Sequence, residues 1–442
     1  MRTKIISLLI ILIVSIAQAQ NVKKWTLREC VEHALKNNIN IKQFELDLLN
    51  ADIDKSDAIG NFLPSLSGNA SIVSSTGLGT DPTTTALVNQ TLFSASGGIG
   101  SNITLFDGMR NFNQLNRAKL NKLASFYRLD DMKDNISLTV ANAYLQILSN
   151  RETLNVIKSQ YLITEQDLKR TETLVENGVV PKGDLLEIEA TAATQEQQIV
   201  AAQNALAISK ITLAQLLTIT DYEDFDIADE GFMIPPSKIL DNTPKEIFNK
   251  ALTFRNDIKF SESNLELAEK DLDIAKGARY PTLNGFFNYN TRYSDSDPFG
   301  LNFIDQLSFY DGISYGLQLN VPILNGFSTK NNIKRNKINV QKSILDLEQN
   351  KLDLESNVNQ AYVDVIGAYK TYQASEKTTE ARRLAFEYAR ERFNVGLMNS
   401  FDFSQAQARV DNAEAELVRS KYDYIFKLKV LEFYFGIPMD EL

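Results

Sequence analysis

Residue types that supply chemistry are scarce in this chain of 442 residues. It has one cysteine, Cys30, and one histidine, His33. A single cysteine excludes an internal disulfide framework and a cysteine-rich metal site. A single histidine leaves out the base and nucleophile sets of most hydrolases and most zinc sites. No glycine-rich phosphate-binding loop is present. We therefore expect no enzymatic activity, no cofactor and no metal.

Positive charge and long apolar runs are also in short supply. The formal net charge is −10, which argues against a nucleic-acid partner. The apolar run from Ile5 to Ile16 is shorter than the roughly 20 residues that span a bilayer as a helix, and no later run is expected to do so. With Arg2 and Lys4 before it and Ala17-Gln18-Ala19 after it, the run has the layout of a signal peptide. We expect cleavage after residue 19, which leaves a mature chain of about −12.

The mature sequence is one motif written twice. A shift of 217 places Thr26 on Thr243 and Leu63-Pro64 on Tyr280-Pro281, and a shift of 218 places Gly178 on Gly396. Internal repeats of this size indicate a structure built from equivalent halves. The expected organisation is a leader (1–19), a first repeat (20–219), a linker or equatorial segment (220–242) and a second repeat (243–442). Each repeat should contain a helix, two strands and a long helical hairpin.

Capping signals and alternation place the first elements of each repeat. Thr26 with Glu29, and Thr243 with Glu246 after Pro244, form capping boxes that start helices running to about Gly60 and Gly277. Period-two alternation then predicts strands of about ten residues, the length that crosses a bilayer with tilt. Their apolar positions are Leu66, Ala70, Ile72, Ile99, Ile103, Leu105, Leu283, Phe287, Tyr289, Ile313, Tyr315, Leu317, Leu319 and Val321.

Two environments fit such strands. A soluble antiparallel sheet packed on helices shows the same alternation. A barrel in a membrane would put the apolar face in lipid and the Asn, Ser, Thr and Gln face in water. Long polar loops and aromatic residues near the strand ends favour the membrane. These aromatic residues are Tyr289, Tyr293, Phe303, Phe309, Tyr310 and Tyr315.

Very long helices follow each pair of strands. The residues from Met109 to about Asn177 would form a rod of roughly 100 Å at 1.5 Å per residue. Apolar positions recur every seven residues, which predicts left-handed coiled-coil packing. They are Val140, Ile147, Leu154, Tyr161, Leu168 and Val175 in the first repeat and Val358, Val365, Tyr372, Thr379, Phe386 and Phe393 in the second. The returning helix has a 3-4 rhythm at Leu185, Ile188, Ala192, Gln195, Ile199, Ala202 and Leu206.

Four strands cannot close a barrel, and bare edges in lipid cost several kcal/mol per unpaired group. The chain must therefore associate with itself. Three copies would give twelve strands and an open lumen, whereas eight strands would fill their interior with side chains. The expected fold class is an α+β membrane protein: a trimer with a 12-stranded outer-membrane β-barrel continued by an α-helical coiled-coil barrel.

From Thr26 to Pro438 the chain resembles the TolC-type outer-membrane efflux and export channels. The resemblance rests on the duplicated unit, on the Leu105-Phe106-Asp107-Gly108 and Ile323-Leu324-Asn325-Gly326 junctions, and on the hairpin tips. It implies a homotrimer in outer-membrane lipid, a helical tunnel in the periplasm, a periplasmic adaptor (membrane fusion) protein and an inner-membrane RND, ABC or MFS pump. Asp107, Gly108, Asn325 and Gly326 would then mark the change from barrel to tunnel.

The hairpin tips carry the candidate entrance of the channel. Asp184 with Glu187, and Asp402 with Gln405, fit helix N-caps with their capping-box partners. The resemblance gives Asp402 a second role in a carboxylate ring at the pore constriction, with Gln405, Asp184 and Glu187 beside it. Gln405 replaces the second ring aspartate of the family, and Phe393 and Met398 replace its locking Tyr and Arg. We therefore expect a weaker cation block and no charged lock, with Glu187 as a source of the missing charge.

The tips are also the expected contact for the adaptor, although an ordinary helical hairpin would have the same sequence. The contact residues are Gly178, Val179, Val180, Pro181, Val395, Gly396, Leu397 and Met398. The predicted function is a passive exit duct for efflux of small molecules or type I protein export. Rival interpretations are a trimeric coiled-coil structural or adhesive protein of the cell surface, and an outer-membrane enzyme, for which one histidine is too few.

Overall fold

The computed structural model describes residues 23–80, 85–228 and 238–437, so the predicted leader lies outside the described residues. The chain divides into two compact units. The first, the hairpin unit, combines residues 1–45, 129–256 and 351–442, and the second, the sheet unit, combines 46–128 and 257–350. Each unit draws on both halves of the sequence.

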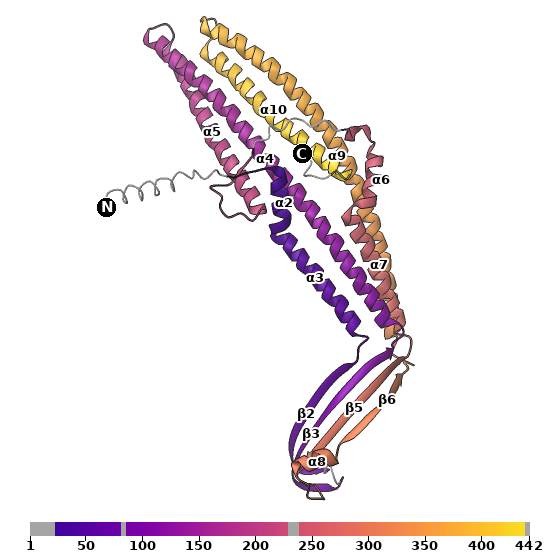
Figure 1. Ribbon diagram of the computed structural model, residues 1–442. Helices are drawn as coiled ribbons and strands as arrows, with labels where there is room; N and C mark the ends of the chain where they lie inside the picture. The colour runs from indigo at the N-terminus through magenta and orange to yellow at the C-terminus, as the bar shows by residue number, and fades with distance from the viewer. Residues whose placement is uncertain (1–22, 81–84, 229–237, 438–442) are drawn as a thin grey trace, which may run out of the picture. The chain divides into compact units, whose positions relative to one another are not determined.

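The order of elements repeats along the chain (Figure 1). Helices α2 and α6 have 11 residues each, α3 and α7 have 22, α4 and α9 have 67, and α5 and α10 have 35. The bounds in the first half are α2 Leu27–Asn37, α3 Ile39–Gly60, α4 Arg110–Glu176 and α5 Lys182–Leu216. In the second half they are α6 Pro244–Phe254, α7 Asn256–Gly277, α9 Ser328–Asn394 and α10 Ser400–Tyr434. The duplication seen in the sequence is thus a duplication of structure.

The capping boxes predicted at Thr26 and at Thr243 are both present, with Pro244 in the first turn of α6. The single helix expected after each of them is wrong, because the chain breaks at Asn38 and Arg255, which have extended backbone. The Asn38 side chain accepts from the Asn40 amide and donates to the Leu216 carbonyl. Leu216 lies at the end of the first hairpin, far from Asn38 in sequence. Its contact with Asn38 therefore accompanies the break between α2 and α3.

Four strands form one antiparallel sheet in the order β2-β3-β5-β6. Their bounds are β2 Ser65–Thr80, β3 Leu87–Phe106, β5 Thr282–Ser294 and β6 Gly312–Asn320. The first two strands are longer than predicted because they pair with each other along the whole of β2. A second, two-stranded sheet joins β1 (Lys24–Trp25) to β4 (Asp226–Ile227) in parallel.

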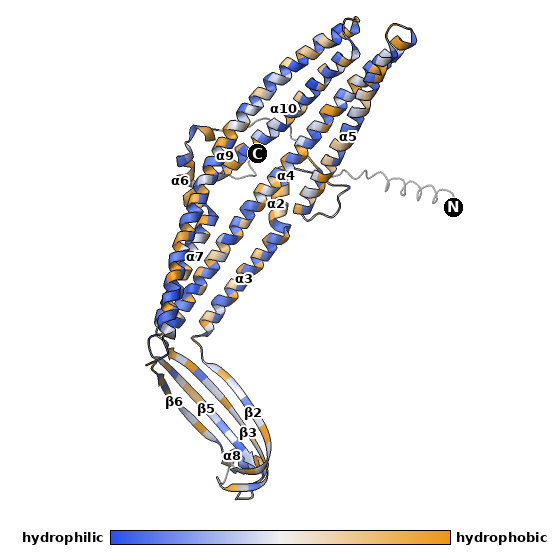
Figure 2. Ribbon diagram, turned by 180° about the vertical axis from the view of Figure 1, so that it is seen from behind, coloured by the Kyte–Doolittle hydropathy of each residue, from blue (hydrophilic) through white to orange (hydrophobic). Residues whose placement is uncertain are grey.

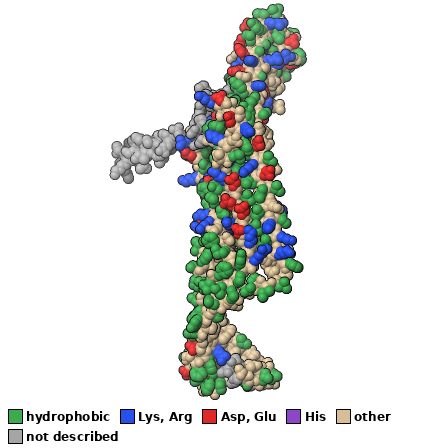
Figure 3. Space-filling model, turned by 90° about the vertical axis from the view of Figure 1, so that its right-hand side faces the viewer, with side chains coloured by type: hydrophobic (Ala, Val, Ile, Leu, Met, Phe, Trp, Pro, Cys, Tyr) green, Lys and Arg blue, Asp and Glu red, His purple; other side chains and the backbone are tan. Residues whose placement is uncertain are grey.

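The register of the sheet separates an apolar face from a polar one. Leu66, Ile72, Ile99, Phe287, Tyr315 and Leu317 share one face, and most of them are exposed. Ser67, Asn69, Asn102, Asn288, Ser314 and Gln318 share the other. Figure 2 shows the alternation of colour along these strands. Arg292 is the one charged residue in the four strands, and Figure 3 shows few charged side chains over them.

The loop between β5 and β6 contains a helix that was not predicted, α8, Phe303–Phe309. Asn302 caps it and accepts from the Asp305 amide at 3.0 Å. The sequence pattern predicts only a polar loop here, because seven residues are too few to show helical periodicity.

The long helices confirm the seven-residue period only in part. Val140, Ile147 and Leu154 are buried in α4, but Tyr161 and Leu168 are partly exposed. The residues buried in their place are Gln160, Thr164, Asp167 and Thr171. A straight helix drifts by about 20° per heptad, which moves a strict seven-residue stripe off the interface. The 3-4 rhythm of α5 is confirmed, since all seven of its predicted positions are buried or partly buried.

One described helix, α5, is long and apolar enough to cross a membrane by length and composition. The expectation that no run after the leader approaches this limit is therefore wrong. Much of the apolar character of α5 comes from alanine, and its buried face includes Gln195, which donates a hydrogen bond to Asp411 of α10. Only 17% of its apolar window is buried, so packing within the hairpin unit covers one face of the helix and leaves the rest exposed.

Candidate functional site

The first strand-to-helix junction lies in the sheet unit and turns through two left-handed residues, Gly108 at φ +74° and Met109 at +65°. Asp107 is buried, and its Oδ2 accepts from the Asn111 amide at 2.8 Å at the start of α4. A Cβ on Gly108 would lie 2.3 Å from the Gly277 carbonyl oxygen. This position therefore requires glycine for two separate reasons.

The second junction has the same backbone in a more open setting. Gly326 and Phe327 have φ of +58° and +65°, and no atom lies within 4 Å of a Cβ built on Gly326. The Asn325 carbonyl accepts from the Ser328 amide at 3.1 Å, and its side chain donates to Thr329. The X-Gly turns predicted from sequence are thus present in both halves, but only the first is closely packed.

The two hairpin tips, in the hairpin unit, close with the same motif. Gly178 and Gly396 have left-handed backbone, at φ +71° and +75°. Each is the second residue after the end of its long helix, α4 or α9. The Val179 amide donates to the Leu174 carbonyl, and the Leu397 amide to the Arg392 carbonyl, both at 2.8 Å. These six-to-one bonds are those of a Schellman motif.

The carboxylates after the tips are not N-caps, which corrects the expectation from sequence. Helix α5 begins at Lys182 after Pro181, so Asp184 lies inside its first turn. Helix α10 is capped by Asn399, whose Oδ1 accepts from the Asp402 amide at 2.7 Å. Both helices start earlier than predicted, because Pro181 and Asn399 occupy the position before the first turn. Asp402 is left exposed in that first turn, where its charge also favours the helix dipole.

The structure divides the predicted entrance residues between two cavities of the hairpin unit. Asp184 lies in a tip groove of about 460 Å³ between the two hairpins, and its Oδ1 accepts from Ser400 Oγ at 2.5 Å. Predicted contact residues in this groove are Val179, Val180, Pro181, Gly396, Leu397 and Met398; Gly178 and Val395 do not line it. Glu187 and Gln405 line a separate cavity of about 280 Å³ between α5 and α10. Asp402 lines neither.

An aromatic stack that the sequence analysis missed supports the second tip. Phe403 is fully buried, and its ring lies 4.4 Å from Phe393 and 5.5 Å from Phe386, centroid to centroid. Phe386 and Phe393 were recognised as heptad positions, but their partner lies across the turn. Phe393 is thus held at the second tip by contact with another aromatic ring.

Helices α5 and α10 meet through polar groups beside the second cavity. Gln195 Nε2 donates to Asp411 Oδ2 at 2.9 Å, whereas the buried Gln195 Oε1 has no hydrogen-bond partner. Burial raises the pKa of Asp411 to about 6, opposed by the Gln195 hydrogen bond and assisted by the charge of Glu414. Glu414 is itself held by Arg383 at 2.6 Å and by Gln160 at 2.8 Å.

Asp411→Asn is expected to stabilise the fold by about 1–2 kcal/mol at pH 7.5, since an amide removes the partly buried charge and can donate to Gln195 Oε1. The folded pKa is raised, so the wild-type penalty applies above about pH 6, falls between pH 6 and about 4, and vanishes below the unfolded pKa. Urea unfolding of both proteins across this range measures the difference. A difference independent of pH would contradict this assignment, and Glu414→Gln, expected to destabilise, is the control.

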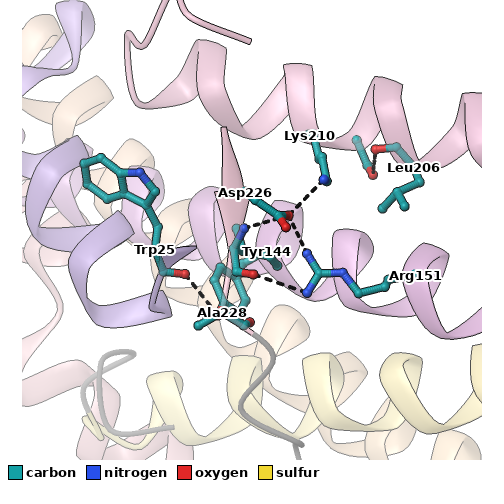
Figure 4. A network of polar contacts seen from close by, with 9 residues as sticks. Trp25, Tyr144, Arg151, Leu206, Lys210, Asp226 and Ala228 are labelled. Carbon is teal, nitrogen blue, oxygen red and sulfur yellow. Dashed lines mark hydrogen bonds and ion pairs between the residues drawn. The ribbon is translucent and has the colours of Figure 1, made fainter. Parts of the chain in front are cut away.

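A polar network within the hairpin unit holds the two short strands β1 and β4 (Figure 4). Asp226 Oδ1 accepts from Arg151 at 2.6 Å and from Lys210 at 2.8 Å. The buried Tyr144 donates to the Ala228 carbonyl at 2.9 Å, and the Ala228 amide donates to the Trp25 carbonyl at 2.9 Å. The sequence signals were too dispersed to predict this network.

The residues that suggested chemistry are structural. Cys30 is fully buried. His33 is half-buried; its ring lies 5.0 Å from that of Trp25, and burial lowers its pKa. In the part of the chain that the structure describes, no three acidic, histidine or cysteine residues gather as a metal site would require.

An antiparallel sheet with an exposed apolar face, repeated helical hairpins and a duplicated chain define a class, the outer-membrane channels. The chain belongs to the outer membrane efflux protein family, whose sequence model matches residues 30–218 and 247–436. This family consists of channels of efflux systems rather than enzymes, and it places the protein in the outer membrane.

Solved structures share the fold. VceC of Vibrio cholerae matches with a TM-score of 0.75 at 17% identity over 93% of this chain and 96% of that chain. CmeC of Campylobacter jejuni matches at 0.77, with 18% identity over 93% and 85%. The open state of MtrE of Neisseria gonorrhoeae matches at 0.72, with 19% identity over 93% and 88%. A search of curated protein sequences found no match.

Proposed function

We propose that three copies of this chain form one outer-membrane exit duct, loaded from the periplasmic side by an adaptor protein and an inner-membrane pump of the RND, ABC or MFS type. Small-molecule efflux and type I protein export are the two uses that such a duct serves. The observation that carries the proposal is the four-stranded sheet, which has an exposed apolar face and a nearly uncharged polar face.

Both edges of this sheet lack a strand partner among the described strands, since β2 and β6 stand at its ends. In lipid each unpaired backbone group costs several kcal/mol. Pairing β6 of one copy with β2 of the next satisfies both edges, and three copies close twelve strands around a lumen lined by Ser, Asn and Gln. The Gly108 and Gly326 turns are then the points where β3 and β6 pass into the tunnel helices α4 and α9.

Asp402 is the residue we assign to an acidic ring at the periplasmic entrance. Its exposure in the first turn of α10 supports the proposal, because an exposed carboxylate repeated by threefold symmetry would act on passing ions. Glu187 and Gln405 lie further along their helices and line the second cavity instead. Asp184 is engaged by Ser400 and contributes less.

The tip groove is the surface that we assign to the adaptor. It is lined by apolar residues together with the polar Thr171, Asp184 and Asn399, and its Val179 and Leu397 are exposed. The exposed Val395 adjoins it, and the left-handed Gly178 and Gly396 shape its two turns. A groove of mixed polarity between two helical tips suits an amphipathic helical hairpin as partner.

Single-channel recording in planar bilayers tests the duct and the ring together. Wild-type protein is expected to give long-lived openings that prefer K⁺ over Cl⁻, and Asp402→Asn is expected to lower this preference by about twofold or more. Asp305→Asn is the matched control, because Asp305 pairs with Asn302 at the start of α8 as Asp402 pairs with Asn399.

Three outcomes would count against these proposals. Unchanged selectivity in Asp402→Asn would remove the acidic ring and leave the duct. Folded trimers without openings would mean that another group seals the entrance. Protein of any other stoichiometry, or protein that does not partition to the outer membrane, would favour the coiled-coil surface protein instead.

A further inference from the structure

The loop from Asp295 to Asp311, which joins β5 to β6 in the sheet unit, exposes an unusual amount of apolar surface. Four of its large apolar side chains are exposed: Phe299 by 66%, Phe303 by 48%, Ile304 by 69% and Phe309 by 59%. The exposed rings of Phe299 and Phe309 contact each other, with centroids 5.6 Å apart. A cluster of this kind on a loop indicates an interaction surface.

The contacts of α8 place it on the apolar face of the sheet. Thr291 Oγ1 donates to the Leu307 carbonyl at 2.6 Å, and the Tyr293 ring lies 5.1 Å from that of Phe303. Thr291 and Tyr293 alternate in phase with Tyr289, which pairs with Ile99 and Ile313. The exposed side chains of the loop therefore continue the apolar face at its end away from the junction turns.

Helix α8 is held firmly in this position. Strand β6 begins opposite Asn290, so the backbone groups of Ser294 have no β6 residue to pair with. The side chain of Gln306, which is 1% exposed, takes that place: its Oε1 accepts from the Ser294 amide at 2.8 Å and its Nε2 donates to the Ser294 carbonyl at 3.0 Å. An amide side chain thus stands in for the missing strand.

The centre of the loop carries no charge, although the loop as a whole contains four aspartates, Asp295, Asp297, Asp305 and Asp311. Residues 298–304 contain no charged residue. Asp297 is turned toward its own loop, where it accepts from the Leu301 amide at 2.9 Å and from Tyr310. Asp305 accepts from Asn302 at 2.6 Å. Asp297 and Asp305 are thus engaged within the loop, whereas Asp295 and Asp311 are exposed at its two ends.

We propose that α8 is an interfacial membrane anchor, with Phe299, Phe303, Ile304 and Phe309 inserted at the boundary between lipid headgroups and acyl chains beside the outer end of the sheet. Aromatic residues favour this boundary, and burial of their apolar area would oppose vertical movement of the strands. The proposal rests on the proposed function, because the apolar face of the sheet must meet lipid. A neighbouring copy is the alternative occupant of this surface.

Quenching of tryptophan fluorescence by brominated phosphatidylcholine tests the anchor in full-length, reconstituted protein. The Trp25→Phe substitution first removes the natural tryptophan. A single tryptophan is then introduced into this background by Ile304→Trp or, in a second variant, by Phe303→Trp. Tyr315→Trp on the apolar face and Asn288→Trp on the polar face are the controls.

We expect lipids brominated near the headgroup to quench both α8 variants by about half or more, and lipids brominated deeper in the chains to quench them less. Tyr315→Trp should be quenched and Asn288→Trp should not. If Tyr315→Trp is quenched but neither α8 variant is, the anchor is refuted. If Tyr315→Trp is not quenched either, the membrane assignment of the sheet fails, and the proposed function fails with it.

Discussion

Gly108→Ala is expected to destabilise the protein by about 3–5 kcal/mol, whereas Gly326→Ala is expected to cost only about 1–2 kcal/mol. Both glycines have positive φ, so both substitutions pay for a left-handed alanine. Only at Gly108 would the added Cβ also meet the Gly277 carbonyl oxygen at 2.3 Å and Tyr280 Cβ at 2.9 Å. Neither contact can relax at low cost, because the Gly277 oxygen belongs to the backbone and Tyr280 Cβ is bonded directly to it.

The repeat supplies the control for this comparison, since the two junctions share a backbone and differ in packing. Thermal and urea unfolding in detergent, followed by circular dichroism, would measure both variants. Gly277→Ala should show the steric part of this loss without the backbone strain, because its Cβ would lie 2.7 Å from the Gly108 carbonyl oxygen and its φ is not positive. Equal losses in Gly108→Ala and Gly326→Ala would show that strain alone explains the glycines.

Asp226→Ala is expected to destabilise the hairpin unit by about 2–4 kcal/mol, because Arg151 and Lys210 would remain partly buried without their shared carboxylate. The loss should extend to the short parallel pairing of β1 with β4, since Asp226 also accepts from the Ile227 amide at 3.0 Å. Urea unfolding gives the free energy, and hydrogen exchange at Trp25 and Ala228 reports the local opening. Glu416→Ala, which removes an exposed ion pair with Arg419, is the control and should change stability by less than about 1 kcal/mol.

The contribution of Asp226 should also depend on pH. Burial by itself would raise the pKa of Asp226, but Lys210, Arg151 and the Ile227 amide outweigh burial and lower it. A depressed folded pKa means that the stabilisation is fully present above the unfolded value of about 3.9 and is lost as pH falls further. The gap between wild type and Asp226→Ala should therefore be constant from pH 5 to 8 and narrow below pH 4. A gap that widened in acid would contradict the ion-pair assignment.

Several candidate residues could be predicted from sequence because their signals are local. The left-handed Gly178 and Gly396 follow from helix-end chemistry, and the X-Gly turns follow from the change of periodicity. The positions of Asp184 and Asp402 were wrong by about one helical turn, since Pro181 and Asn399 each stand three residues earlier and begin the helix there. The boundaries at 20–219, 220–242 and 243–442 remain a prediction, as do the trimer and the roles of the tip residues.

The sequence by itself determined the duplication, both capping boxes, the two faces of the strands and the turns between strands and helices. The capping boxes, the strand faces and the turns each depend on residues within a few positions of one another, and the duplication appears when the two halves of the sequence are compared. The tertiary structure alone decided the breaks at Asn38 and Arg255, the polar residues buried in α4, the Asp226 network and the place of α8. These features depend on partners far away in the chain, such as Leu216 for Asn38 and Ser294 for Gln306. A local pattern states what a segment can form, and contacts with distant segments select among the possibilities.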